Sequence, residues 1–233
     1  MSYFDFLHRI NKEEVNVIFE LGSRDLIDAI KLLEIFDKSN IYSFECNDDC
    51  LIECYKTLSK LDINKRKRLF LINNAVSLEN GPVSFYPFDL QQFNNMGASS
   101  MLKIDFSMRN KDDVDYNRPN PQKEIVVYGT RLDTFIQSRQ ITNIDLLCID
   151  LQGYELQAIK SMGYFLHKVK YIITECSIDN TYVGGASFTE LNDYLKKFNF
   201  KYVLSNRFGE NYPDLSLRGY SEFDALFVNE SPF

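Results

Sequence analysis

The sequence predicts an α/β domain built on an open, mostly parallel, Rossmann-like sheet, with helices on both faces and an antiparallel last strand. Three observations indicate this fold. Short apolar runs rich in β-branched residues recur along the chain and are bounded by turn residues, as buried parallel strands are. Amphipathic segments alternate with these runs. The last two runs follow one another without a helix between them, which predicts a neighbouring antiparallel pair.

Length and composition fit one domain in a reducing compartment. The chain has 233 residues, of which 45% are hydrophobic, enough for a single α/β domain with an insertion. No apolar run approaches the roughly 20 residues that span a bilayer, and the charged start of the chain is unlike a signal peptide. The five cysteines show no framework spacing, which favours reduced thiols and a cytoplasmic location.

The chain is acidic, with a formal net charge of −7. Binding to nucleic acid or to anionic membranes relies on clusters of Lys and Arg. We therefore expect a small-molecule partner, without nucleic acid and without a membrane span. The sequence leaves the oligomeric state open.

The expected elements follow in order along the chain. Residues 1–14 form a leading helix or arm. The predicted strands cover residues 15–20, 41–45, 69–76, 83–88, 124–129, 144–150, 169–175, 201–205 and 221–230. The predicted helices cover residues 24–37, 47–61 and 131–139, a segment that starts near Tyr154, and residues 187–200, which open on a capping box of Ser187 and Glu190.

Two connections carry their own signals. Asn80-Gly81 predicts a hairpin turn between the runs at 69–76 and 83–88. Residues 89–123 are rich in Asn, Asp, Gln and Ser and show no sustained periodicity, so we interpret them as a long insertion. Such insertions serve either as lids and substrate-facing loops or as surface excursions.

The first two strands carry a nucleotide-binding pattern. The run VNVIFELGSR at 15–24 places Glu20 and Gly22 at the end of the first strand, and IYSFECN at 41–47 places Glu45 at the end of the second. A glycine there permits a sharp turn and close approach of a ligand, and the helix that follows would offer free N–H groups. An acidic residue ending the next strand can accept hydrogen bonds from two ribose hydroxyls.

This pattern alone leaves alternatives open. The dinucleotide fingerprint G-x-G-x-x-G is incomplete, because Gly22 is the one glycine in the loop. An ordinary strand–turn–helix fits the segment equally well, and a nicotinamide-dependent oxidoreductase stays an alternative because of the spacing of Glu45.

Two further carboxylates end buried strands. Asp150 closes the run IDLLCID, and Glu175 closes the run VKYIITE. Open α/β sheets bind ligands at the carboxyl ends of their strands, so the two side chains could face one crevice. Like charges would then raise one pKa and favour a base or a divalent ion, whereas each residue could also be a helix cap or a surface carboxylate.

Several blocks in this order resemble the FkbM family of class I S-adenosylmethionine-dependent methyltransferases. The blocks span about residues 15–176 and comprise FELGS at 19–23, FEC at 44–46, NNAVS at 73–77, TRLDTF at 130–135, IDLLCIDLQGYELQAI at 144–159 and ITE at 173–175. The resemblance implies a class I sheet with a reversed last strand. It also implies an S-adenosylmethionine-dependent O-methyltransferase that acts on a hydroxyl of a sugar, a glycan or another small molecule.

The resemblance also implies roles for single residues. Asp150 and Glu175 are the candidate catalytic residues, and a divalent metal could bind near them. The candidate cofactor-binding residues are Glu20, Gly22, Ser23, Glu45, Cys46, Asn74, Ala75 and Asp150. In these roles the Gly22–Ser23 backbone lines the methionine portion and Glu45 holds the ribose.

The chain also departs from the family pattern. The family usually carries Asn and a second Gly where this chain has Arg24 and Asp25, and commonly has Lys and Glu where this chain has Cys148 and Gln152. A non-catalytic module that kept the fold is therefore a further alternative.

Two smaller groups complete the candidates. Ser99 and Ser100 align loosely with a family segment near the cofactor. Cys46, Cys50 and Cys54 are spaced to stack on one helix face, where packing explains them better than zinc does, because no His or further Cys is placed nearby in the sequence to complete a structural zinc site.

Overall fold

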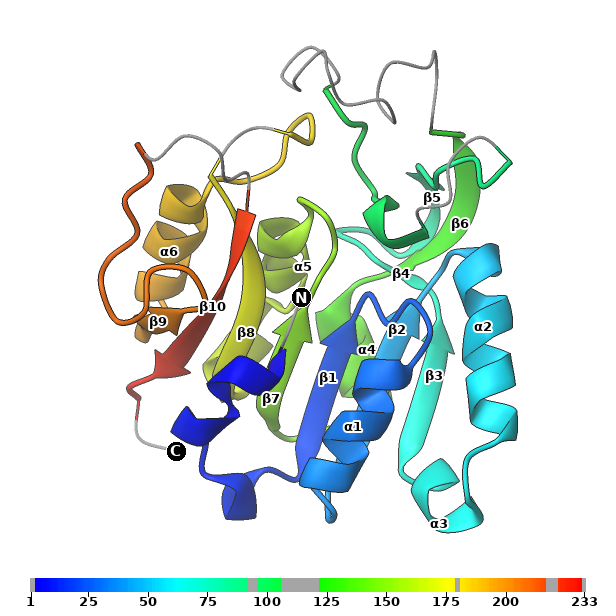
Figure 1. Cartoon of the computed structure of the whole chain (residues 1–233), viewed down its shortest axis with the longest axis horizontal. Helices are drawn as coiled ribbons and strands as arrows, with labels where there is room; N and C mark the ends of the chain where they lie inside the picture. The colour runs from blue at the N-terminus through cyan, green and yellow to red at the C-terminus, as the bar shows by residue number, and fades with distance from the viewer. Residues whose placement is uncertain (1–2, 92–95, 106–121, 179–180, 217–221, 232–233) are drawn as a thin grey trace.

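The computed structural model has a central sheet between two layers of helices (Figure 1), and it describes residues 3–91, 96–105, 122–178, 181–216 and 222–231. The strands of the main sheet are, in spatial order, β3 (Leu69–Asn73), β2 (Asn40–Glu45), β1 (Val17–Leu21), β7 (Ile144–Ile149), β8 (Val169–Ser177), β10 (Glu222–Asn229) and β9 (Phe200–Ser205). The five strands from β3 to β8 are parallel, whereas β10 is antiparallel to both of its neighbours. This arrangement confirms the predicted fold class.

Helices cover both faces of the sheet and give two hydrophobic cores. One core joins the sheet to α4 (Leu132–Ser138), α5 (Glu155–Ser161) and α6 (Phe188–Lys196). The other joins it to α1 (Ile27–Ile35), α2 (Asp48–Ser59) and the leading arm. The arm consists of two 3-10 helices, Tyr3–Arg9 and Lys12–Glu14, and Phe6 anchors the first of them in the core. None of the helices in the described part of the chain has the length and hydrophobicity to cross a bilayer.

A small second sheet lies beside the carboxyl end of β3 and contains β4 (Ala75–Val76), β6 (Ile125–Thr130) and β5 (Gly81–Phe85). The predicted hairpin between the runs at 69–76 and 83–88 is wrong, because β5 pairs with β6 rather than with the strand before it. The predicted strand 69–76 is divided in two: β3 pairs with β2 in the main sheet and β4 pairs with β6. Asn74 lies where the chain passes from one sheet to the other.

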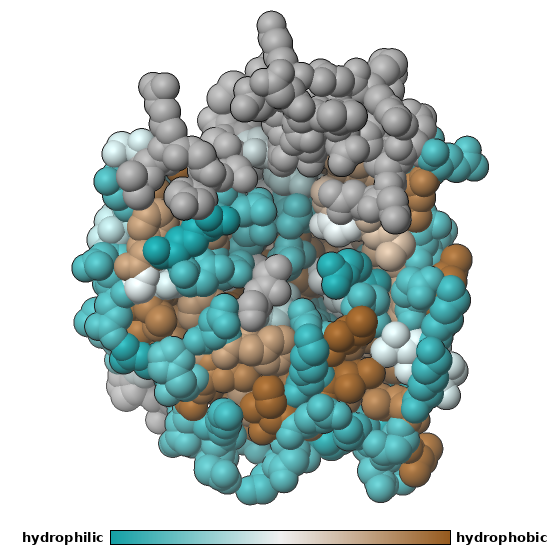
Figure 2. All heavy atoms as spheres, in the orientation of Figure 1, coloured by the Kyte–Doolittle hydropathy of each residue, from teal (hydrophilic) through white to brown (hydrophobic). Residues whose placement is uncertain are grey.

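Part of the insertion packs over the carboxyl ends of the parallel strands. The 3-10 helix Met96–Ala98 is followed by residues up to Asp105, whose backbone N–H donates to the Thr181 carbonyl over 2.8 Å. The rest of the prediction for 89–123, at 92–95 and 106–121, lies outside the described residues. Figure 2 shows polar side chains interspersed with hydrophobic ones on the face seen in Figure 1.

Candidate functional site

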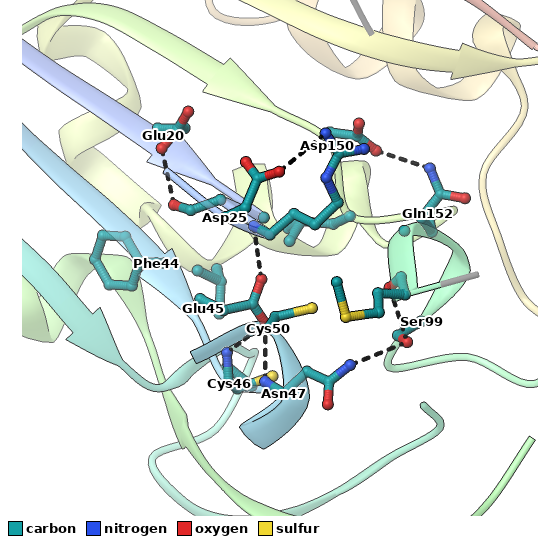
Figure 3. Close-up of a pocket in the computed structure, with 18 of the residues that line it drawn as sticks. Glu20, Asp25, Phe44, Glu45, Cys46, Asn47, Cys50, Ser99, Asp150 and Gln152 are labelled. Atoms are coloured by element: carbon teal, nitrogen blue, oxygen red, sulfur yellow. Dashed lines mark hydrogen bonds and ion pairs between the residues drawn. The ribbon is translucent and has the colours of Figure 1, made fainter. Parts of the chain in front are cut away.

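A cavity lies at the carboxyl ends of β1, β2 and β7, between these strand ends and the described part of the insertion (Figure 3). All eight residues predicted to bind a cofactor line it: Glu20, Gly22, Ser23, Glu45, Cys46, Asn74, Ala75 and Asp150. The cavity forms where helices cross to opposite faces of the sheet on either side of β1. This is the position at which open α/β sheets bind ligands.

Gly22 lets β1 and the loop after β7 approach each other. Its φ is +89°, and a Cβ atom at this position would lie 1.9 Å from the backbone oxygen of Asp150. Its N–H and that of Ser23 donate to the Phe44 carbonyl over 3.0 and 3.1 Å. The glycine therefore permits a close approach between the end of β1 and the loop after β7 at the cavity.

The loop after Gly22 differs from the sequence-based expectation. The predicted helix 24–37 begins only at Ile27, because Arg24 and Leu26 have φ of +52° and +64°. The N–H groups of Asp25 and Leu26 donate to the Ser23 carbonyl, and the N–H of Ile27, the first residue of α1, donates to the Asp25 carboxylate. These three N–H groups are therefore already paired within the loop.

Glu45 organises the loops on either side of the cavity. One carboxylate oxygen accepts the N–H groups of Cys46 and Asn47, both over 2.8 Å, and the other accepts the N–H of Arg24 over 2.9 Å. Burial raises the pKa of Glu45, and these three hydrogen bonds oppose the increase. A carboxylate has about four lone-pair sites, so it retains acceptor capacity toward a ligand hydroxyl.

Glu20 is buried, and none of the cations that the structure describes forms an ion pair with it. Its carboxylate accepts the hydroxyl groups of Ser23 and Ser43, each over 2.8 Å. Burial raises its pKa to about 7, although both hydroxyl groups lower it. A positively charged ligand group beside Glu20 would therefore lower its pKa and favour the ionised carboxylate.

Asp150 and Glu175 come together through a third side chain. The amide nitrogen of Gln152 lies 2.7 Å from Asp150 Oδ1 and 3.1 Å from Glu175 Oε2. Burial raises the pKa of both carboxyls, and Asp150 raises that of Glu175 further. Asp150 lines the cavity, whereas Glu175 lies behind Gln152 and is not among the lining residues.

Glu155 stabilises the turn that carries Gln152. It is buried, and its Oε1 accepts the N–H groups of Leu151 and Gly153 over 2.9 and 3.1 Å. Burial raises its pKa to about 7. Glu155 lies in the first turn of α5, where its carboxylate is an internal acceptor for the turn that precedes the helix.

The serines of the insertion take different places. Ser99 lines the cavity, and its hydroxyl oxygen accepts the Asn47 amide N–H over 3.3 Å. Ser100 is buried outside the lining, where its hydroxyl donates to the Gln152 carbonyl over 2.8 Å. Residues 99 and 100 thus fasten the insertion to both sides of the cavity.

Sequence reasoning missed several lining residues. Tyr3 reaches the cavity from the leading arm, and Phe85, Met96 and Met101 reach it from the small sheet and the insertion. Their distance in sequence from the strand ends left no local signal. Asn47 could have been found, because it directly follows Glu45 and is the N-cap of α2.

The cysteine cluster is internal. Cys46, Cys50 and Cys54 are buried free thiols, and burial raises the pKa of each. Among the residues that the structure describes, no group of three or more His, Cys, Asp or Glu side chains is placed to hold a metal ion. Cys46 and Cys50 line the cavity as apolar walls.

Comparison with solved structures shows the same fold. The fibrillarin pre-rRNA processing protein of Methanococcus jannaschii has a TM-score of 0.51 at 11% identity, covering 96% of this chain and 70% of its own. The methyltransferase FkbM of Methylobacillus flagellatus KT has a TM-score of 0.50 at 12% identity, covering 92% of this chain and 43% of its own. TrmK of M. capricolum, solved with S-adenosylhomocysteine, has a TM-score of 0.50 at 12% identity, covering 99% of this chain and 69% of its own.

Comparison of sequences identifies the family. The 2-O-methyltransferase NoeI of Sinorhizobium fredii (strain NBRC 101917 / NGR234) is 28% identical over 186 residues, covering 78% of this chain and 72% of that protein. The sequence profile of the Methyltransferase FkbM domain matches residues 29–202, about three quarters of the chain. This match removes the oxidoreductase alternative. The chain belongs to the FkbM methyltransferase domain family and is an S-adenosylmethionine-dependent methyltransferase.

Proposed function

We propose that this protein is an O-methyltransferase that methylates a hydroxyl group of a sugar, a glycan or another small polyol. The observation that carries the proposal is the position of Asp150, a carboxylate exposed to the same cavity as Gly22 and Glu45. The printed name of the Sinorhizobium relative, a 2-O-methyltransferase, supports a hydroxyl acceptor.

The residues of the cavity fit the cofactor. When bound, S-adenosylmethionine supplies a methyl group attached to a positively charged sulfur. Glu45, with acceptor capacity left over from its three N–H partners, would hold the ribose hydroxyls. Cys46, Asn74 and Ala75 would border the adenine. The methionine portion would lie on the other side of the ribose from the adenine, against the Gly22–Ser23 backbone.

Two carboxylates would act beyond the adenosine. Glu20 would neutralise the amino group of the cofactor, directly or through water, because it is buried and no described cation pairs with it. Asp150 would accept the proton of the acceptor hydroxyl as the oxygen–methyl bond forms and the methyl–sulfur bond breaks, which would leave S-adenosylhomocysteine as a neutral thioether. Glu175 shares the Gln152 amide with Asp150. Desolvation raises the pKa of Asp150, which favours its use as a base.

A neutral acceptor suits the charges of the cavity. Carboxylates from Glu20, Asp25, Asp28, Glu45 and Asp150 line it, and Arg24 is the cation among the described lining residues. Such a site would repel phosphates and other polyanions, so we propose a small-molecule acceptor rather than nucleic acid. The five free, buried cysteines support a reducing compartment such as the cytoplasm.

The test is an assay of methyl transfer to a panel of sugars, oligosaccharides and other hydroxyl compounds. The amount of S-adenosylhomocysteine released measures turnover. We expect turnover with at least one polyol, and Asp150→Asn should lower kcat by about 10²–10⁴-fold, as loss of a general base does. Asp193→Asn, in an exposed ion pair with Lys196, is the control and should keep full activity. Transfer to amines alone, or full activity of Asp150→Asn, would contradict the proposal.

A further inference from the structure

Gln152 uses every polar atom of its side chain. Its amide nitrogen donates one hydrogen to Asp150 Oδ1 over 2.7 Å and the other to Glu175 Oε2 over 3.1 Å. Its amide oxygen accepts the hydroxyl of Tyr182 over 2.9 Å. Figure 3 shows Gln152 beside Asp150 at the edge of the cavity. An amide in this network cannot rotate by half a turn without placing its oxygen against two carboxylates.

The backbone of this residue is held as firmly as its side chain. Gln152 has φ of +53°, a left-handed conformation that is uncommon for a residue with a side chain. Gly153 follows with φ of +94°, and a Cβ atom there would lie 2.7 Å from the side chain of Tyr182. Ser100 binds the Gln152 carbonyl from the insertion. A conformation this unfavourable persists when the surrounding structure determines it, and such positions cluster at functional sites.

The charges around the pair favour a neutral hydrogen-bond donor at position 152 in this chain. Asp150 faces the charges of Arg24 and Asp28. Glu175 faces Asp150 and three further acidic groups, which are Glu155, Glu222 and Asp224. Burial raises the pKa of Asp150, and burial together with these acidic neighbours raises the pKa of Glu175 well above its ordinary value. The Gln152 hydrogen bond opposes the increase at Asp150, so this amide stabilises the ionised form of the carboxylate that lines the cavity.

We propose that Gln152 is a positioning residue for the methyl transfer, because its amide donates to both carboxylates and holds the Asp150 carboxyl group toward the cavity in which the acceptor hydroxyl would lie. This inference rests on the proposed function of Asp150 as the base. Tyr182 acts one step further out by fixing the orientation of the amide. Removal of the two N–H donors should therefore raise the pKa of Asp150. The cavity walls around the adenosine should stay in place.

The test follows the two carboxyls directly. Proteins labelled with ¹³C at the Asp and Glu carboxyls are titrated by NMR, and the two signals are assigned with Asp150→Asn and Glu175→Gln. Gln152→Glu keeps the shape of the side chain and replaces both donors, and Gln152→Leu removes them without adding charge. In both variants the pKa of Asp150 should rise by about one or more, a tenfold change in proton affinity. The acidic limb of the pH–rate profile should move to higher pH with it.

A second glutamine provides the control. Gln157, five positions further along, donates to the Gly184 carbonyl over 3.0 Å and does not contact the carboxylate pair. Gln157→Leu should leave both titrations unchanged. An Asp150 titration that is the same in wild type and in both Gln152 variants would overturn the inference. Calorimetry with S-adenosylhomocysteine on the wild type separates the proposed methyl transfer from the positioning role of Gln152. Absence of binding would contradict the proposed function. The titrations would still decide the role of Gln152.

Discussion

Gly22 determines how closely two loops approach at the floor of the cavity. A sharp turn at this residue is expected from the sequence, since glycine follows the strand, and its φ of +89° fits such a turn. The contact with Asp150 could not be predicted, because it joins two strands more than a hundred residues apart in the sequence. The same holds for Gln152, which looked like a departure from the family and proves to join Asp150 to Glu175.

Gly22→Ala tests the close approach. The added methyl group would meet the Asp150 carbonyl at 1.9 Å, so the loop must shift, and we expect a fall of several degrees in Tm together with at least tenfold weaker binding of S-adenosylhomocysteine. Gly184→Ala is the matched control: its φ is +79°, yet a Cβ atom there meets nothing within 4 Å. This control should cost only about 1 kcal/mol of backbone strain. Equal losses of Tm and of S-adenosylhomocysteine binding in both variants would show that the positive φ of Gly22, rather than its contact with the Asp150 carbonyl, is what matters.

At the scale of elements, the local patterns predicted strands and helices well. The capping box of Ser187 and Glu190 starts α6, and the apolar runs coincide with the strands of the main sheet to within a few residues. The prediction of a hairpin at Asn80-Gly81 is wrong, because a turn signal indicates where a chain can reverse but not with which strand the next segment pairs. Here β5 pairs with β6, which begins forty residues later, beyond the insertion.

The cavity is the result of the same long-range pairing. Pairing of β4 and β5 with β6 places Ala75 and Phe85 in one small hydrophobic cluster against Cys46. The predicted site residues at the strand ends were found because a parallel sheet gathers those ends at one edge. The walls contributed by the arm and the insertion were not found, because nothing in a local pattern indicates where such segments fold back.

At the scale of the whole molecule, acidic side chains are buried together at the carboxyl edge of the sheet. Glu20 and Glu155 both have their pKa raised to about 7, and burial is the largest cause for each. The folded state therefore keeps protons that the unfolded chain, with pKa values near 4.5, releases. Their contribution to stability is complete below about pH 4.5 and is lost as pH rises through about 7.

We therefore expect the free energy of unfolding to fall between about pH 4.5 and about pH 7, by on the order of 1–3 kcal/mol per group at most, and to level off at higher pH. Urea unfolding at a series of pH values measures this slope. Glu20→Gln keeps an oxygen that can accept from Ser23 and Ser43 but cannot ionise, so its slope should be flatter than that of the wild type. Identical slopes for the two proteins would contradict the claim that Glu20 is protonated in the folded state.

The central claim is that the ends of β1 and β2 together hold the adenosine of the cofactor, and Glu45 tests it most directly. Calorimetry should compare S-adenosylhomocysteine binding to wild type, to Glu45→Gln and to Glu53→Gln, an exposed control on α2 that pairs with Lys56. Loss of a charged acceptor for the ribose hydroxyls should weaken binding to Glu45→Gln by about 100-fold. A fall of a few degrees in Tm should accompany it, because the new NH2 group faces a backbone N–H that Glu45 accepts in the wild type. The control should bind as the wild type does. Equal affinity of wild type and Glu45→Gln would contradict the placement of the cofactor between these two strand ends.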